Sequence, residues 1–125
     1  MSAAPGPPLR VVIVDNDPDA LDLLDLDLAL EGHDIVGRGR SGEEAIALCR
    51  ELSPDLLVVD FRMPPGPNGL AVVQELHGQP GLNMIIYTNY RDTSNRARAT
   101  ALGASYLLKG DLRTLRTEIA KIDRG

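Results

Sequence analysis

Short apolar runs alternate along the chain with longer segments whose apolar residues recur every three or four positions. Short runs rich in leucine and β-branched residues are typical of buried strands. The longer segments predict helices with one buried face. The expected strands are residues 11–14, 34–36, 56–59, 84–87 and 106–108, and the expected helices are residues 18–31, 41–52, 70–77, 94–102 and a last one that begins after residue 111.

Five strands that alternate with five helices predict an α/β fold with a parallel sheet covered on both faces. Local signals agree with this order: Asp17-Pro18 is typical of a helix start, and three prolines and two glycines make residues 63–69 a loop. At 125 residues the chain fits one domain, which we expect to span residues 9–125. Residues 1–8 contain three prolines and are expected to form a flexible tail.

Composition narrows the possible partners. The formal net charge of −5 at pH 7 argues against direct nucleic-acid binding, which needs a basic surface. The apolar runs are too short to span a bilayer, so no membrane contact is expected. The single cysteine, Cys49, has no internal partner for a disulfide, which favours a reducing compartment and a cytoplasmic location.

Charge is also unevenly distributed along the sequence. Residues 1–90 carry 5 basic and 14 acidic side chains, whereas residues 91–125 carry 8 basic and 4 acidic ones. Such polarity can steer a protein partner. It is equally explained by helix faces that keep the protein soluble.

Four polar residues stand where predicted strands end: Asp15, Asp60, Thr88 and Lys109. In parallel α/β sheets, ligands bind beyond the carboxyl ends of the strands, so these four side chains should project into one crevice. One strand-end polar residue alone would carry no functional meaning. Four of them together predict a ligand-binding site.

The four side chains suit the binding of a metal ion and a phosphoryl group. Two carboxylates 4 Å apart repel by about 1 kcal/mol in water and about 4 kcal/mol at an effective dielectric constant near 20. Mg²⁺ relieves such repulsion and prefers carboxylate, phosphate and water oxygens. A lysine and a hydroxyl nearby can neutralise and orient a phosphoryl group. Asp60, which ends the central strand, is the best candidate for a nucleophile that forms an aspartyl phosphate.

The chain resembles the receiver domains of bacterial response regulators, the phosphorylated switches of two-component signal transduction, over residues 10–123. The resemblance is carried by the acidic cluster Asp15-Asn16-Asp17-Pro18, by Asp60-x-x-Met63-Pro64, by Thr88, and by Tyr106-Leu-Leu-Lys109. It implies a flavodoxin-like, doubly wound sheet with strand order 2-1-3-4-5.

By this resemblance, Asp60 accepts a phosphoryl group from a sensor histidine kinase or a histidine phosphotransfer protein. Mg²⁺, or Mn²⁺ in its place, is held by Asp15, Asn16, Asp60 and the main-chain carbonyl of Arg62. Lys109 contacts the phosphoryl oxygens, and the chain is not a turnover enzyme.

The resemblance also implies a switch. Thr88 turns towards the phosphoryl group, and Tyr106 turns inward into the space that Thr88 leaves. This movement changes the face made by the fourth helix, fifth strand and fifth helix, which contacts a downstream protein or a dimer partner.

The sequence departs from the family pattern at several positions. Asn16 stands where the family has a second acid, so Mg²⁺ affinity should fall. Bulky Arg62 and Tyr90 flank the path of the attacking water, which predicts slow self-dephosphorylation. These departures keep open an alternative function, a degenerate receiver that acts as a protein-interaction module without phosphorylation.

Two enzyme-like interpretations compete with the receiver. Gly37-Arg-Gly-Arg-Ser-Gly42 matches the dinucleotide-binding pattern, but it leaves Asp15, Thr88 and Lys109 unexplained. Asp15-Asn-Asp17 resembles the opening motif of haloacid-dehalogenase-type phosphatases, although the later acidic pair of that family is missing. The phosphatase would carry phosphate on Asp15, and the receiver on Asp60.

Overall fold

The computed structural model describes residues 8–122 of the chain, which form five strands and five helices in strict alternation. The elements are β1 (Arg10–Val14), α1 (Pro18–Leu30), β2 (Asp34–Gly39), α2 (Gly42–Leu52), β3 (Leu56–Val59), α3 (Gly69–Leu76), β4 (Asn83–Thr88), α4 (Thr93–Ala101), β5 (Ser105–Leu108) and α5 (Leu112–Ala120).

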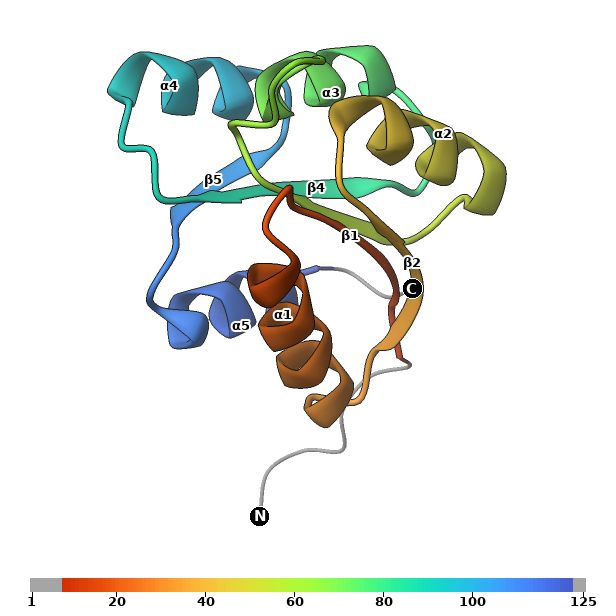
Figure 1. Cartoon of the computed structure of the whole chain (residues 1–125). Helices are drawn as coiled ribbons and strands as arrows, with labels where there is room; N and C mark the ends of the chain where they lie inside the picture. The colour runs from red at the N-terminus through yellow and green to blue at the C-terminus, as the bar shows by residue number, and fades with distance from the viewer. Residues whose placement is uncertain (1–7, 123–125) are drawn as a thin grey trace.

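The five strands form one parallel sheet in the order β2-β1-β3-β4-β5. Helices α1 and α5 cover one face, and α2, α3 and α4 cover the other (Figure 1). The doubly wound architecture and the strand order predicted from the sequence are therefore confirmed. The strand order reverses direction between β1 and β3, which is where such folds bind their ligands.

The central strand β3 shows why its sequence is apolar at every position. Leu56 and Val58 pack into the cluster under α1 and α5, whereas Leu57 and Val59 pack into the cluster under α2, α3 and α4. Successive side chains of a strand point to opposite faces. A strand covered by helices on both faces therefore needs apolar residues throughout.

Strand β2 is longer than the sequence predicted, because it continues through residue 39 instead of ending at residue 36. Glycine is rare in strands, which hid this extension. The close approach of α2 explains the glycines, since a Cβ added at Gly37 or Gly39 would lie 3.2 Å or 3.1 Å from side chains of that helix. Both glycines are strand residues, which removes the structural basis of the dinucleotide-binding interpretation.

Helix α1 begins as its sequence predicts. The side chain of Asp17 caps the helix by accepting a hydrogen bond from the backbone N–H of Asp19 at 3.0 Å. The predicted stripe of Leu21, Leu24 and Leu28 is buried against the sheet. The cap fixes the segment that follows β1 and so helps to position the polar residues at the end of that strand.

The loop between β3 and α3 returns very close to the end of β3. The N–H of Gly69 donates to the carbonyl of Phe61 at 2.8 Å, and a Cβ at Gly69 would lie 2.5 Å from the carbonyl oxygen of Asp60. Only glycine fits this position without a backbone shift. The start of α3 therefore supports the backbone of Asp60.

Two further predictions concern the N-terminal tail and the absence of membrane-spanning segments. The predicted flexible tail, residues 1–8, falls outside the described residues except for Pro8. Within residues 8–122, no helix combines the length and apolar character needed to cross a membrane.

Candidate functional site

The parallel register brings the predicted site residues to one edge of the sheet. Val14 pairs with Val59, so Asp15 and Asp60 leave their strands side by side. The N–H of Asp60 donates to the carbonyl of Val14 at 3.0 Å. Lys109 follows β5 in the same way, and its N–H donates to the carbonyl of Thr88 at 2.8 Å.

The ammonium group of Lys109 lies between two buried carboxylates. Its Nζ is 2.5 Å from Oδ2 of Asp15 and 3.3 Å from Oδ2 of Asp60. Asp15 is only 4% exposed and Asp60 is 9% exposed. One positive charge is therefore shared by two carboxylates that water reaches poorly, which leaves local negative charge for a cation.

The pKa values of Asp15 and Lys109 reflect both their burial and the charges around them. Burial raises the pKa of Asp15, and the nearby charge of Asp60 acts in the same direction, against the hydrogen bond from Lys109. Burial alone would lower the pKa of Lys109, but its hydrogen bond with Asp15 and the charge of Asp60 raise it overall. Lys109 therefore stays protonated at neutral pH.

Backbone N–H groups hold the other carboxylate oxygens. Oδ1 of Asp15 accepts from the N–H of Asp17 at 2.9 Å. Oδ1 of Asp60 accepts from the N–H of Phe61 at 2.7 Å. Both side chains are thus fixed before any ligand arrives, which is the preorganisation that phosphoryl transfer requires.

A cleft of about 500 Å³ opens beside Asp60. Its lining residues come from the loops after β1, β3 and β4: Asn16, Asp60, Arg62, Pro64, Thr88, Asn89 and Tyr90. Thr88 is 2% exposed, and its hydroxyl oxygen accepts a hydrogen bond from the N–H of Tyr90 at 3.2 Å. The structure therefore brings Asn16, Asp60, Arg62 and Thr88 to one cleft. Asp15 and Lys109 line a separate cavity of about 170 Å³ beside α1, so the single crevice predicted for the strand-end residues is divided, and the two parts meet where Lys109 contacts Asp60.

Tyr106 is buried in this structure, with 5% of its surface exposed. Its hydroxyl donates to the carbonyl of Tyr90 at 2.5 Å. The inward position that the resemblance assigns to the switched state is thus the position that the ring occupies here.

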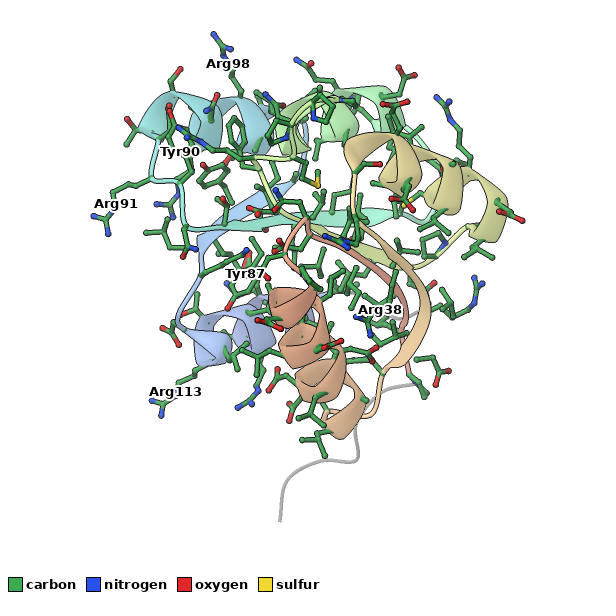
Figure 2. All side chains as sticks on the ribbon, viewed as in Figure 1. Arg38, Tyr87, Tyr90, Arg91, Arg98 and Arg113 are labelled. Atoms are coloured by element: carbon green, nitrogen blue, oxygen red, sulfur yellow. The ribbon has the colours of Figure 1, made fainter. Side chains whose placement is uncertain are left out.

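The sequence analysis expected Arg62 and Tyr90 beside the path of the attacking water, but it missed that side chains stack over the cleft. The rings of Phe61 and Tyr90 are stacked with centroids 5.3 Å apart, and the guanidinium carbon of Arg62 lies 3.8 Å from the centroid of the Tyr90 ring. Tyr90 lies on the same side of the sheet as α4, whereas Tyr87 lies on the side of α1 and α5 (Figure 2). A further signal for the stack was that Phe61 and Tyr90 each stand within two residues of a predicted site residue.

The donor set at this edge fits Mg²⁺. Across residues 8–122, no three side chains of His, Cys, Asp or Glu gather into a metal-binding group. Mg²⁺ does not need three, because it commonly binds one or two carboxylates and keeps water and phosphate oxygens as its other ligands. The two buried carboxylates of Asp15 and Asp60, with Asn16 and Arg62 beside them, meet that requirement.

Comparison with known proteins decides the family. The model of the response regulator receiver domain matches residues 11–120. The chain belongs to the response regulator receiver family. Receiver domains are the switch domains of two-component signal transduction, and they generally bind Mg²⁺ at an acidic phosphorylation site.

Relatives of this receiver domain are response regulators about twice its length. It is 35% identical over 101 residues to the DNA-binding response regulator MtrA of Mycolicibacterium smegmatis, covering 80% of this chain and 43% of that protein. It is 34% identical over 111 residues to the probable transcriptional regulatory protein TcrX of Mycobacterium tuberculosis, covering 87% of this chain and 47% of that protein. The receiver domain thus spans less than half of these relatives.

Solved structures agree with the fold of the receiver domain. The signal receiver domain of a modulated diguanylate cyclase from Desulfovibrio desulfuricans matches with a TM-score of 0.81 and 27% identity, over 92% of this chain and 93% of that one. A CheY-like receiver domain protein from Methanospirillum hungatei matches with a TM-score of 0.80 and 25% identity, over 90% of each chain. The family and fold inferred from the sequence motifs are therefore confirmed.

Proposed function

We propose that this receiver domain is a phosphorylation-dependent switch in which Asp60 accepts the phosphoryl group. One observation carries the proposal: two buried carboxylates share the ammonium group of Lys109, with its Nζ 2.5 Å from Asp15 and 3.3 Å from Asp60. Thr88 and Asn16 line the same cleft as Asp60. This arrangement offers a nucleophile, positive charge and a hydrogen-bond donor to one phosphoryl group.

The reaction is a displacement at phosphorus. A carboxylate oxygen of Asp60 forms a new P–O bond while the bond to the donor breaks, which is a P–N bond in a phosphohistidine or a P–O bond in acetyl phosphate. The bonding electrons leave with the donor group. The ammonium group of Lys109 neutralises charge on the transferred phosphoryl oxygens, and the hydroxyl of Thr88 donates a hydrogen bond to one of them.

The metal ligands in this proposal are Asp15, Asn16, Asp60 and the main-chain carbonyl of Arg62. Bound Mg²⁺, or Mn²⁺, supplies further neutralisation of the phosphoryl oxygens. The chain is modified on its own aspartate, and it does not catalyse the turnover of a metabolite.

The partners follow from the same proposal. A sensor histidine kinase or a histidine phosphotransfer protein supplies the phosphoryl group, in the cytoplasm. Phosphorylation draws Thr88 towards the phosphoryl group and favours the inward position of Tyr106 that the ring already has in this structure. This shift alters the face made by α4, β5 and α5, which binds a downstream protein or a second copy. Residues 9–125 form the switching unit, and the domain itself binds neither nucleic acid nor membrane.

The test is intact mass after incubation with Mg²⁺ and acetyl phosphate. We expect one added phosphoryl group in the native chain, no addition after removal of Mg²⁺ with a chelator, and no addition in Asp60→Asn. An adduct that persists in Asp60→Asn would overturn the assignment of Asp60.

A second candidate function is a receiver that binds its partner without phosphorylation. Asn16 favours it, because an amide replaces a carboxylate among the metal ligands and Lys109 already neutralises part of the remaining charge. Titration with Mg²⁺ separates the two functions. A chain that neither binds Mg²⁺ nor gains mass would support the phosphorylation-independent module.

A further inference from the structure

Three of the four aromatic residues of the chain gather beside Asp60. The sequence contains three tyrosines, one phenylalanine and no tryptophan. Phe61, Tyr90 and Tyr106 form one cluster, in which Phe61 stacks on Tyr90 and meets Tyr106 edge to face at 6.3 Å. With Arg62 over the Tyr90 ring, the cluster joins the loop after β3 to the loop after β4.

The backbone of Tyr90 contacts both residues assigned to the switch. Its N–H donates to the hydroxyl oxygen of Thr88 at 3.2 Å, and its carbonyl accepts from the hydroxyl of Tyr106 at 2.5 Å. A hydroxyl has one hydrogen to donate and two positions at which it accepts. With one accepting position taken by the N–H of Tyr90, Thr88 keeps its hydrogen for a phosphoryl oxygen in the cleft.

The ring of Tyr90 fixes where its backbone lies. An aromatic pair adds about 0.5–1.5 kcal/mol beyond the burial of its surface, and a cation over a ring adds about 0.5–1 kcal/mol at an exposed site. These contacts hold the loop after β4 against Phe61 and Arg62, which adjoin Asp60 in the chain. The sheet fixes the backbone of Thr88, and the orientation of its hydroxyl depends on the Tyr90 side chain, which holds the N–H from which this hydroxyl accepts a hydrogen bond.

We propose that Tyr90 is a positioning residue for phosphoryl transfer, whose stacked ring holds the N–H group that orients Thr88 and the carbonyl that retains Tyr106. This role rests on the proposed function of Asp60. It goes beyond that function by assigning the orientation of Thr88 to contacts made by Phe61 and Arg62.

The experiment compares phosphorylation rates at saturating Mg²⁺ and acetyl phosphate. Tyr90→Ala should be slower by about tenfold, because both ring contacts are lost. Tyr90→Phe should restore the native rate, because the contacts use the ring and the backbone and not the phenol oxygen. Arg62→Met should be slower by about two- to fivefold, the factor that one exposed cation–π contact represents. Arg98→Met, an exposed change on α4, is the matched control and should not alter the rate.

A double variant separates positioning from general disturbance. If Arg62 acts through the Tyr90 ring, Arg62→Met should have no further effect in the Tyr90→Ala chain. The Mg²⁺ midpoint of Tyr90→Ala should equal that of the native chain, because its loss lies in the rate at saturation. Tyr90→Leu keeps the apolar bulk without the ring and should be phosphorylated as slowly as Tyr90→Ala. It replaces Tyr90→Ala in the experiment if circular dichroism shows that the alanine variant is unfolded.

The outcomes are distinguishable from failure of the proposed function. A native chain that gains no phosphoryl group contradicts the role of Asp60 itself. A native chain that is phosphorylated, together with a Tyr90→Leu chain that reacts at the native rate, overturns the role of Tyr90 alone. Independent, multiplicative effects of Arg62→Met and Tyr90→Ala also overturn it.

Discussion

At the scale of single residues, the site depends on Lys109 and the two carboxylates that share it. Asp15, Asp60, Thr88 and Lys109 were predictable from the sequence, because each follows or ends an apolar run and parallel strands finish at the same edge. The stack of Arg62 on Tyr90 was not predictable. These residues are far apart in the chain, and their contact depends on the path of two loops that no periodic pattern describes.

Asn16 provides a test of the metal ligands at this scale. Asn16→Asp should bind Mg²⁺ more tightly, because it adds a negative charge that is worth about 1 kcal/mol per unit charge at 4 Å even in water. Calorimetric titration with Mg²⁺ measures the change against the native chain. Equal or weaker binding by Asn16→Asp would remove residue 16 from the metal site.

Arg62 and Tyr90 also predict a long-lived phosphorylated form. Both residues line the cleft that water must enter to reach a phosphoryl group on Asp60. We expect the adduct to persist for minutes or longer after removal of the donor, and to decay faster in Arg62→Ala, which clears the entrance. Decay of the native adduct within seconds, followed by intact mass, would contradict this account.

At the scale of elements, the sequence predicted every helix and strand, with most boundaries within one or two residues. The exception was β2, whose last residues include Gly37 and Gly39. Their place in the strand depends on the close packing of α2. Such a tertiary contact is invisible to a local propensity, since glycine is disfavoured in strands that do not need the space.

The start of α3 supports Asp60, and Gly69→Ala tests that support. The added methyl would meet the carbonyl oxygen of Asp60 at 2.5 Å, so the backbone must shift. We expect a loss of about 1–3 kcal/mol in the free energy of unfolding and slower phosphorylation, measured by urea denaturation and intact mass.

Gly66→Ala is the matched control in the same loop. Its methyl would meet only the carboxylate end of Glu43, at 2.9 Å, and that flexible side chain can move aside. Equal free energies of unfolding for Gly69→Ala and Gly66→Ala would show that the close approach of Gly69 to Asp60 does not contribute to stability.

At the scale of the whole molecule, basic and acidic residues concentrate on different helices. The basic excess of residues 91–125 falls largely on α4 and α5, where Arg98 and Arg113 point away from the sheet, as does Arg91 in the loop before α4 (Figure 2). Acidic residues concentrate on α1 and at the site edge. Helices α1 and α5 share one face of the sheet, where Arg116 forms ion pairs with Asp27 and Glu31, so part of this asymmetry is neutralised within the domain (Figure 1).

Metal binding should stabilise the whole fold. A ligand that binds only the native state adds about 1.4 kcal/mol at ten times its dissociation constant. Mg²⁺ should therefore raise the midpoint of thermal unfolding of the native chain, and raise it less in Asp15→Asn. An equal shift in both chains would indicate that Mg²⁺ binds elsewhere.

The central claim is that Asp60 carries the phosphoryl group, and borohydride reduction tests it most directly. Reduction converts an aspartyl phosphate to homoserine, and peptide mass spectrometry then locates the converted residue. After reaction with acetyl phosphate and Mg²⁺, we predict homoserine at position 60 and unchanged aspartate at position 15. Homoserine at position 15 instead would contradict the account and favour the phosphatase-like chemistry of the opening acidic motif.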